Sequence, residues 1–583
     1  MRRVRSSRSL AVAFAFAATL GSFAPAQANP GITVRGSERS GGGQANGHSP
    51  ARSVPDLTSP AMSLDGTRLA YSSDATNLVD GDTNGVADIF LRDDKGRVTR
   101  VSTNKQGHQA NGASYSPALS VNGRYLAFIS TATNLVPNDT NGVADVFLKN
   151  LWSGSVRRVS VSSKGTQANG ASNRPFISLF GDYITFESEA TNLSLLDDNR
   201  LSDAFLYTVK SRTTQRLTAP VPPDPSPGDL KVKTSRASIS YDGATLTYQR
   251  HLLREGVAFP VAADVFVVNR KLEETERIKM SPWGGVAKRM IENPMVSADG
   301  HYVAYEAWSA ITAKHTVGGN NPFGISSENT DAIARNPYEI KTIYLYDAWK
   351  KVSFPASTNP GGPLANGDCF DAAPNAYGTI IAFSCEATNM VAGDTNDAVD
   401  VFVRDFPGRV TARVSVADDQ SEGFGASTRP SITYEGRTVA FASTVPTFVD
   451  DDSNAKDDVF IRDRQIHLPN SKPDLYRPFS GEKQGLNILE EFRFKMTAKD
   501  PDDDVVRYGA ITALPEGARI DPLTGIFTWT PTPDQTEPGG KGYDIALWVS
   551  DPRGNYDLEL LQLVVRDASS STRCTTLGHA CYP

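Results

Sequence analysis

The chain has 583 residues, of which 39% are apolar and 21% charged, with 47 Gly and 36 Pro. These values exclude a disordered chain and are typical of a turn-rich, all-β globular protein. The formal charge of −7 argues against a nucleic-acid-binding protein, which normally carries a basic face. At this length we expect two domains.

The first 28 residues have the organisation of a secretory signal peptide. Several arginines precede an apolar run over residues 10–23, and small residues surround Gln27. The run is short for a bilayer span, so an uncleaved anchor is the weaker alternative. No later segment approaches 18 continuous apolar residues. We therefore expect a secreted or periplasmic protein without a transmembrane segment in the mature chain.

The next part of the chain repeats one unit. Asp82, Asp139 and Asp197 are spaced by 57 and 58 residues, a period that indicates a repeat fold. Within one unit, residues 118–160 read as four short strands, with an Asn-Gly turn after the first. Alternating apolar positions, β-branched and aromatic residues, and such turns predict antiparallel strands. Four strands per unit are typical of a β-propeller blade.

Counting these units predicts a seven-bladed propeller over residues 30–465. The seventh unit lacks its fourth strand, whereas residues 32–37 precede the first unit without a partner. We therefore predict that residues 32–37 pair with the last sheet and remove an open edge. The units begin near Pro60, Pro117, Pro175, Ala237, Pro294, Ala373 and Pro430.

These units resemble the TolB-type, WD40-like β-propeller repeat. Its blades carry a Ser-x-Asp-Gly turn, an Ala-Phe strand as at Phe128, and an Asp-x-Phe strand as at Phe147. The resemblance implies the fold and leaves activity open, because the class includes binding scaffolds, propellers attached to peptidases and sugar-acid lyases. The peptidases need a large α/β-hydrolase domain, and the sequence contains no Gly-x-Ser-x-Gly elbow.

A different pattern follows a linker over residues 466–473. Residues 474–567 contain an acidic segment from Asp500, a Thr-Trp-Thr-Pro motif at Trp529 and strand alternation near Trp548. This segment looks like an immunoglobulin-like, cadherin-like module of bacterial surface proteins, and its length suits a small β-sandwich. Residues 568–583 form a polar tail.

The four cysteines suit an oxidising compartment. Cys369 and Cys385 align with a serine pair of an earlier unit, at the same end of two paired strands, and we predict a disulfide between them. Cys574 and Cys581 are expected to close a second small loop in the tail. Zinc is the alternative, but these cysteines lack the close spacing of a structural zinc site.

The loop between the second and third strands of a unit carries repeated oxygen ligands. In the first and seventh units these side chains occupy the first, third, fifth and ninth positions of a calcium-type loop. The possible calcium ligands are Asp80, Asp82, Asn84, Asp88, Asp450, Asp452, Asn454 and Asp458. Leu91 stands where an EF-hand carries its bidentate Glu. The alternative, which we favour for any single loop, is that these residues cap turns.

Two units interrupt this pattern. The fourth carries His251 and Arg254 in place of the acidic loop, and an insertion in the fifth contains His315, Arg335 and Tyr338. Loops of adjacent blades lie side by side, so a base, a cation and an acid would meet there. β-Elimination on a uronic-acid polymer requires that set. The alternative is a variable surface loop.

The sequence thus predicts a non-catalytic binding scaffold that recognises a protein or a glycan on the face of the long loops. The alternative is a polysaccharide (uronate) lyase using the loops of units four and five. No cofactor other than calcium and no nucleic-acid partner is expected.

Overall fold

The computed structural model describes most of the chain, and every structural statement below concerns these residues. They are 31–54, 60–64, 66–120, 123–178, 181–195, 201–217, 230–254, 260, 262–278, 291–309, 340–359, 364–464, 473–476, 484–500, 506–510, 514–522, 524–550 and 556–567. The predicted signal peptide and the tail with Cys574 and Cys581 lie outside them. No helix in these ranges is long and apolar enough to cross a membrane.

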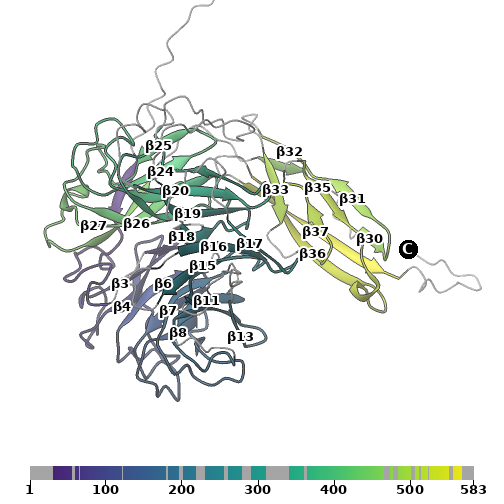
Figure 1. Ribbon diagram of the computed structural model, residues 1–583, viewed down its shortest axis with the longest axis horizontal. Coiled ribbons are helices and arrows are strands. Elements are labelled where there is room, and N and C mark those ends of the chain that lie inside the picture. Colours follow the sequence, from purple (N-terminus) through teal and green to yellow (C-terminus); the bar gives the residue numbers. More distant parts are fainter. Residues whose placement is uncertain are drawn as a thin grey trace, which may run out of the picture.

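The described chain is all β, with repeated four-stranded sheets (Figure 1). Six sheets take four consecutive strands each, and we number them in chain order. The first three comprise β2 (Ala61–Met62), β3 (Arg68–Ser73), β4 (Asp88–Asp93), β5 (Val98–Arg100); β6 (Ser114–Leu119), β7 (Tyr125–Ser130), β8 (Asp145–Asn150), β9 (Val156–Arg158); and β10 (Ser172–Ile177), β11 (Tyr183–Ser188), β12 (Asp203–Thr208), β13 (Thr213–Arg216). The next three comprise β14 (Leu230–Ile239), β15 (Thr245–Arg254), β16 (Ala262–Asn269), β17 (Glu274–Arg277); β18 (Ile291–Val296), β19 (Tyr302–Ser309), β20 (Ile340–Asp347), β21 (Val352–Pro355); and β22 (Cys369–Pro374), β23 (Ile380–Cys385), β24 (Asp400–Asp405), β25 (Val410–Arg413).

The seventh sheet combines both ends of the repeat region. It contains β26 (Ser427–Ile432), β27 (Thr438–Ser443) and β28 (Asp458–Asp463), with the short 3-10 helix η3 (Pro446–Phe448) between β27 and β28. Its fourth strand is β1 (Ile32–Arg35), which pairs antiparallel with β28. In Figure 1 this N-terminal strand is the purple one among green strands. The pairing is the one that the unmatched N-terminal segment predicted.

Aromatic pairs hold the second and third strands of every sheet together. Phe128 and Phe147 lie opposite each other in the register of β7 and β8, with ring centroids 5.8 Å apart. The other six sheets repeat the pair at centroid distances between 5.5 and 6.1 Å. These rings are buried or nearly so. The repeated aromatic positions of the sequence therefore build the apolar contact within each sheet.

The seven sheets are arranged around one cavity. Neighbouring first strands contact one another in chain order from β2 to β26, and β2 also contacts β26. The first strands of all seven sheets line the same cavity. Tight turns join first to second strands at one end, and the longer loops join second to third strands at the other. We call these ends the turn face and the loop face.

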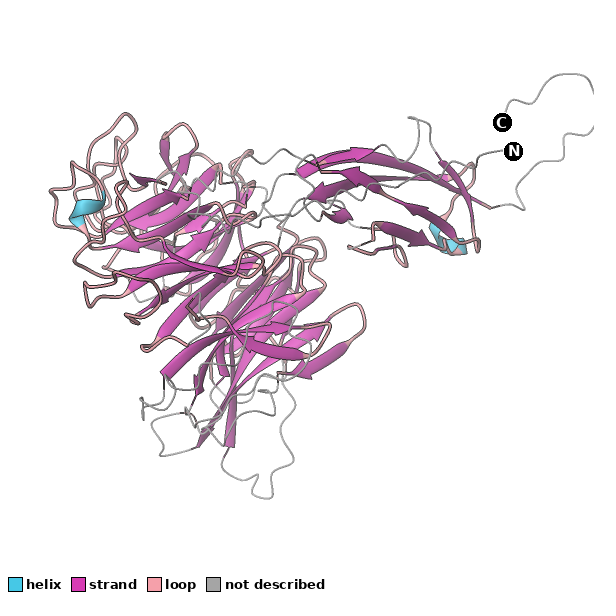
Figure 2. Cartoon of the chain, turned by 90° about the horizontal axis from the view of Figure 1, so that it is seen from above, coloured by secondary structure: helices cyan, strands magenta, loops and turns pink. Residues whose placement is uncertain are grey.

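Residues 473–567 form a separate set of sheets, drawn to the right of the repeated sheets in Figure 2. The strands are β29 (Asp474–Tyr476), β30 (Gln484–Asn487), β31 (Phe492–Lys495), β32 (Thr497–Lys499), β33 (Arg507–Ala510), β34 (Arg519–Ile520), β35 (Ile526–Trp529), β36 (Lys541–Ser550) and β37 (Tyr556–Arg566), with the 3-10 helix η4 (Pro533–Gln535). One sheet has the order β30-β37-β36-β33, a second β31-β35-β34, and a ribbon pairs β29 with β32. They enclose their own apolar core around Phe527 and Trp529.

This set of sheets touches the turn face of the sixth and seventh sheets through aromatic rings. Tyr377 lies 5.4 Å from Trp548, and Tyr434 lies 6.0 Å from Tyr556, between ring centroids. The hydroxyl of Tyr377 donates to that of Tyr434 at 3.3 Å. The aromatic contact leaves the loop face clear of these sheets.

The predicted disulfide between Cys369 and Cys385 is present. The two residues are opposite each other in the register of β22 and β23. In the second sheet the same positions hold Ser114 and Ser130, whose hydroxyls lie 2.9 Å apart. The bond fits an oxidising, extracytoplasmic compartment.

Candidate ligand-binding cavity

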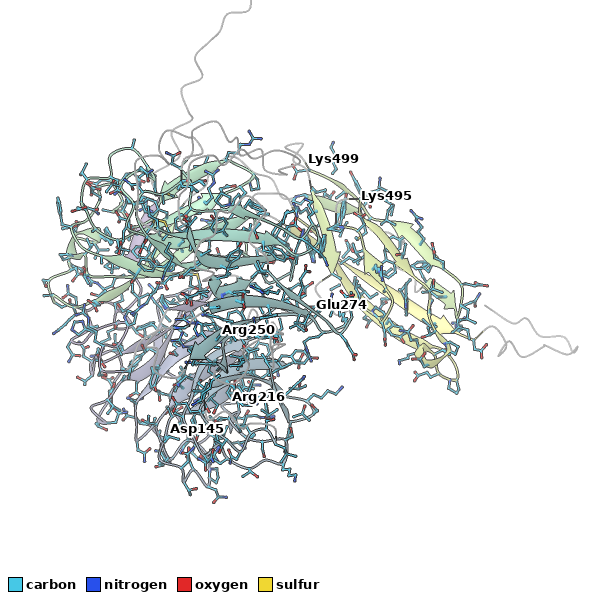
Figure 3. All side chains as sticks on the ribbon, viewed as in Figure 1. Asp145, Arg216, Arg250, Glu274, Lys495 and Lys499 are labelled. Atoms are coloured by element: carbon cyan, nitrogen blue, oxygen red, sulfur yellow. A yellow bond between two sulfur atoms is a disulfide. The ribbon has the colours of Figure 1, made fainter. Side chains whose placement is uncertain are left out.

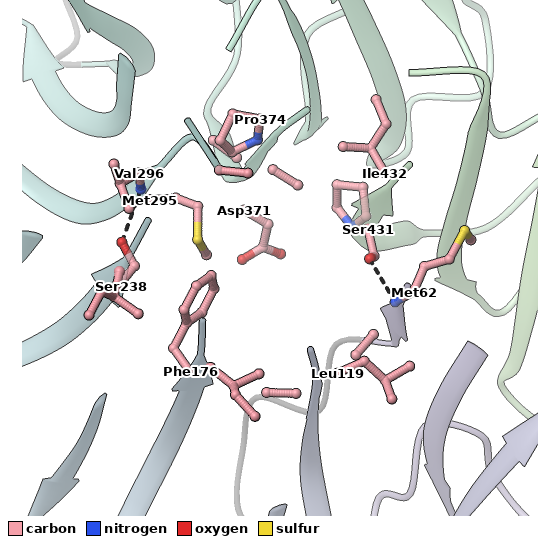
Figure 4. A pocket seen from close by; sticks show the side chains of 18 of the residues that line it. Met62, Leu119, Phe176, Ser238, Met295, Val296, Asp371, Pro374, Ser431 and Ile432 are labelled. Carbon is pink, nitrogen blue, oxygen red and sulfur yellow. Dashed lines mark hydrogen bonds between the residues drawn. The ribbon is translucent and has the colours of Figure 1, made fainter. Parts of the chain in front are cut away.

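The cavity enclosed by the first strands has a volume of about 370 Å³ (Figure 4). That volume lies at the lower end of the range for small-ligand sites, and suits one sugar ring or one amino-acid side chain. Its lining combines apolar side chains such as Phe176, Met295 and Ile432 with polar ones such as Asp371. The charged residues of the lining lie toward one end.

A bulge in the first strand places a polar side chain at the loop-face end of the cavity. In six sheets the bulge residue has φ between 49° and 59°, and the strand register shifts there in each of the six. Such values are uncommon for residues other than Gly, and bulges re-aim side chains. These six residues, all in the cavity lining, form what we call the mouth ring. They are Ser116, Arg174, Arg236, Asn293, Asp371 and Arg429.

The preceding sheet supports the mouth ring through its second strand. The backbone N–H of Arg236 donates to Glu187 Oε1 at 2.9 Å, and that of Asp371 donates to Glu306 Oε1 at 3.1 Å. The N–H of Asn293 and Arg429 donate in the same way, to Gln249 Oε1 and Ser384 Oγ at 3.0 and 3.1 Å. Each acceptor directly follows the aromatic residue of its second strand. Side chains from one sheet thereby fix the bulge of the next.

The mouth ring carries opposite charges close together. Arg174 Nε lies 3.4 Å from Glu187 Oε1, and Lys341 Nζ lies 3.2 Å from Glu306 Oε2. Burial raises the pKa of Glu306. Three guanidinium groups therefore lie at the mouth together with carboxyl groups whose ionised form is disfavoured by burial.

Asp371 is the acidic member of the mouth ring and points into the cavity in Figure 4. Burial raises the pKa of its carboxyl, and the positive charges of Arg429 and Arg236 oppose that rise. Toward the turn face the wall is uncharged, with Phe176 and Met295 in the same layer as Ser238 and Ser431. A ligand group that enters from the loop face meets charged side chains first and an uncharged, largely apolar wall below them.

His251 lies near this mouth, on the long strand β15. Its Nε2 is 3.5 Å from Glu292 Oε1, and its ring contacts the Gln249 amide. The hydrogen bond with His251 lowers the pKa of Glu292, and the charges of Lys341 and Arg236 lower it further. Of the predicted lyase set, His251 is thus in a charged cluster beside the cavity. The Arg254 side chain, His315, Arg335 and Tyr338 lie outside the described residues, so their meeting stays a prediction.

The predicted calcium loops surround arginines in the structure. In the first sheet Arg100 Nη1 lies 3.4 Å from Asp82 and 4.0 Å from Asp88. The Asn84 amide donates to Asp88 Oδ2 at 3.0 Å, so Asn84 turns its nitrogen, not its oxygen, toward that carboxylate. Asp80 is exposed and pairs with Arg39 at 2.8 Å.

The seventh sheet repeats this arrangement with an arginine from β1. Arg35 lies 4.0 Å from Asp452 Oδ2 and 3.8 Å from Asp458 Oδ2. The Asn454 amide donates to Asp458 Oδ2 at 3.3 Å, while Asp450 is exposed. The acidic pairs of both loops thus have a guanidinium as a neighbour.

Other sheets pair acids with arginines in the same way. In the sixth sheet, oxygens of Asp394, Asp400 and Glu422 lie within 4.8 Å of one another, and Arg413 Nη1 is 3.2, 3.2 and 2.5 Å from them. Arg158 contacts Asp139 and Asp145 in the second sheet, and Arg216 contacts Asp203 in the third. Figure 3 marks the places of Asp145 and Arg216. These contacts support the turn-capping, ion-pair interpretation, and calcium binding stays a prediction.

A calcium titration separates these two interpretations. We expect calcium or a chelator to leave the unfolding temperature of the protein unchanged, because the Arg100 guanidinium already lies beside Asp82 and Asp88. Arg100→Ala removes that cation, so its unfolding temperature should be lower and should rise when calcium is added. Thermal unfolding followed by circular dichroism measures both. A lower unfolding temperature of the unmutated protein after chelation would instead support a calcium site.

The acid clusters also predict a pH dependence of stability. Burial raises the pKa of Asp394 and that of Asp458 to about 6. Because the pKa of each carboxyl is higher in the folded than in the unfolded protein, each contributes stability that is fully present below about pH 4. This contribution is lost as the pH rises through about 6. Asp394→Asn should flatten this fall in urea unfolding between pH 4.5 and 7.5, whereas Asp80→Asn at an exposed site should not. Equal pH slopes for Asp394→Asn and the unmutated protein would contradict the assignment.

The sequence motifs did not reveal the mouth ring. Its members differ in side-chain type, and only their shared position in the repeat unites them. One signal was present in the sequence. Glu187, Gln249 and Glu306 place a long polar side chain directly after the second-strand aromatic, where the other units have the shorter or apolar residues Ser72, Ile129, Ser384 and Ala442.

No protein family model and no curated protein matches this chain. Similar solved structures include a TolB protein of Agrobacterium tumefaciens, with 16% identity and a TM-score of 0.29 over 52% of this chain and 81% of the other. A puromycin-hydrolysing peptidase of Mycobacterium tuberculosis has 13% identity and a TM-score of 0.40, over 74% and 57%. Human protocadherin-24 EC1-2 has 19% identity and a TM-score of 0.14, over 17% and 46%.

Proposed function

We propose that residues 30–465 form a seven-bladed β-propeller and that residues 474–567 form an immunoglobulin-like module. The first strands of all seven sheets line one cavity, and contact between β2 and β26 brings the first and last sheets together. The strand β1 then completes the last blade. The separate apolar core around Trp529 supports an independent second module.

We propose that the protein is a secreted or periplasmic binding scaffold, without catalysis, that holds an anionic group of a protein or a glycan in the central cavity. The mouth ring carries the argument. Arg174, Arg236 and Arg429 surround an opening whose inner wall is apolar. Guanidinium groups bind carboxylates through paired, charge-assisted hydrogen bonds. An acidic side chain or a uronate ring is an anionic group of a size that the cavity admits.

Arg236 gives the sharpest test of this proposal. Arg236→Gln should weaken binding of an acidic peptide or of an oligogalacturonate about 10-fold or more, because a charge-assisted hydrogen bond is lost. Isothermal titration with both probes, and with neutral counterparts, measures the change. Arg39→Gln removes an exposed arginine that does not line the cavity and should leave affinity unchanged. Equal affinities of Arg236→Gln and the unmutated protein would refute a role for the mouth ring.

The second candidate function is uronate β-elimination. The pair formed by His251 and Glu292 favours it, because a carboxylate beside an imidazole supports a general base. The same titrations can be read by ultraviolet absorbance, since elimination creates an unsaturated uronate. Absorbance that grows with time and is abolished in His251→Gln would establish the lyase and exclude a purely binding role.

A further inference from the structure

A second hollow lies on the outer rim, between the second and third sheets. Its volume is about 710 Å³, and residues of β9, the following 161–165 segment and the β12–β13 turn line it. The side chain of Ser163 bridges to the edge strand β13, because Thr214 N–H donates to its oxygen at 2.9 Å. We call this hollow the rim groove. It is separate from the central cavity, and the two linings share no residue.

Basic side chains dominate the rim groove. Arg157, Lys164 and Arg212 line it, and all three are exposed. Arg158 also lines it but is held by Asp139 and Asp145. The lining contains no Asp or Glu. Among the described residues no ion pair is formed by the first three, which leaves three cations directed at solvent around one hollow.

This patch is positively charged, whereas the whole chain has a net charge of −7. Elsewhere in the repeat region, some basic residues near the fourth strand pair with acids, as Arg97 pairs with Asp93 at 3.0 Å and Lys351 with Glu276 at 3.1 Å. Concentrating unpaired cations on one face costs free energy by mutual repulsion, which a bound anion relieves. The groove, at about 710 Å³, is larger than a site for one small ion requires. An extended polyanion is the partner that matches three separated cations.

An exposed tryptophan adjoins the groove and indicates the chemistry of that polyanion. Trp152 lies in the β8–β9 turn whose residues Asn150 and Ser155 line the groove. Its side chain is 68% exposed, and the Arg124 guanidinium packs over the ring at 4.6 Å. Arg124 thereby holds the indole as a flat apolar surface in water, which suits stacking by the apolar face of a sugar ring.

We infer that the rim groove binds an acidic polysaccharide, with Arg157, Lys164 and Arg212 contacting its carboxylate or sulfate groups and Trp152 stacking on a sugar ring. The disulfide at Cys369 supports an extracytoplasmic setting, where such polymers occur. The inference does not rest on the function proposed for the central cavity. Arg236→Gln should leave groove binding unchanged.

The test uses the full-length protein carrying Arg236→Gln, which weakens galacturonate binding in the central cavity, and four probes: polygalacturonate, dextran sulfate, neutral dextran and single-stranded DNA. We expect the two acidic polysaccharides to bind and neutral dextran not to bind. The triple variant Arg157→Gln/Lys164→Gln/Arg212→Gln should weaken that binding about 10- to 100-fold and reduce its salt dependence. The matched control Lys95→Gln/Lys105→Gln/Lys231→Gln removes the same charge at exposed sites outside the groove and should retain nearly full affinity.

The effect of Trp152→Ala distinguishes a polysaccharide partner from other polyanions. It should weaken binding of both acidic polysaccharides several-fold while leaving the unfolding temperature unchanged, since Trp152 is exposed. The two sugar probes distinguish carboxylate from sulfate preference. No binding by the unmutated protein, or equal losses in the groove and control triples, would overturn the inference. DNA binding of equal strength with no effect of Trp152→Ala would overturn the assignment to polysaccharide.

Discussion

Arg35→Ala is expected to lower the free energy of unfolding by about 3–5 kcal/mol. The Arg35 side chain is only 2% exposed and lies near three carboxylates of the seventh sheet, among them Asp452 and Asp458. Without its guanidinium, two buried carboxylates lack their cation, and the strand that completes the sheet loses its contact with the loop. Urea unfolding followed by tryptophan fluorescence measures the loss.

Two further variants keep this prediction testable if Arg35→Ala fails to fold. Arg39→Ala removes an exposed arginine from its pair with Asp80 and should cost less than about 1 kcal/mol. Asp458→Asn in the Arg35→Ala background removes one uncompensated charge and should recover part of the stability. If Arg35→Ala were as stable as Arg39→Ala, the stabilising role assigned to the Arg35 guanidinium would be wrong.

Reduction of the Cys369–Cys385 bond is expected to lower the free energy of unfolding by about 2–4 kcal/mol. The bond joins residues 16 positions apart, and a cross-link of that length restricts the unfolded chain. The comparison is between oxidised protein and protein treated with a reductant, each unfolded in urea.

The repeat itself supplies the control for this prediction. The double variant Cys369→Ser/Cys385→Ser recreates the hydroxyl pair that Ser114 and Ser130 form at 2.9 Å. It should match the reduced protein to within about 1 kcal/mol and should not respond to reductant. A response that survives in the double variant would place the sensitive bond elsewhere, and no response in the unmutated protein would contradict the prediction.

The sequence predicted the parts of the structure that depend on repetition. The unmatched segment at residues 32–37 indicated the partner of β28, because six other units show four strands. Alignment with a serine pair indicated the disulfide, since equivalent positions in a repeat occupy equivalent places. Because the repeat units share one backbone arrangement, comparing their sequences reveals that arrangement.

Features that depend on individual side-chain orientation were not predictable in this way. Spacing alone indicated Asn84 as a possible calcium ligand, and it did not indicate that the Asn84 amide nitrogen donates to Asp88. Arg100 comes from a neighbouring strand, so no local motif includes it. Likewise the mouth ring unites residues from six separate strands. Of the lyase hypothesis, His251 and Arg254 lie on strand β15 and not on the predicted loop, and His315, Arg335 and Tyr338 lie outside the described part of the chain.

Cocrystallisation with an oligogalacturonate or an acidic peptide tests the central claim most directly. The account predicts a ligand carboxylate within hydrogen-bond distance of at least one guanidinium among Arg174, Arg236 and Arg429, with the rest of that residue against Phe176 or Met295. A ligand bound with high occupancy elsewhere on the loop face, with the cavity holding only solvent, would contradict it.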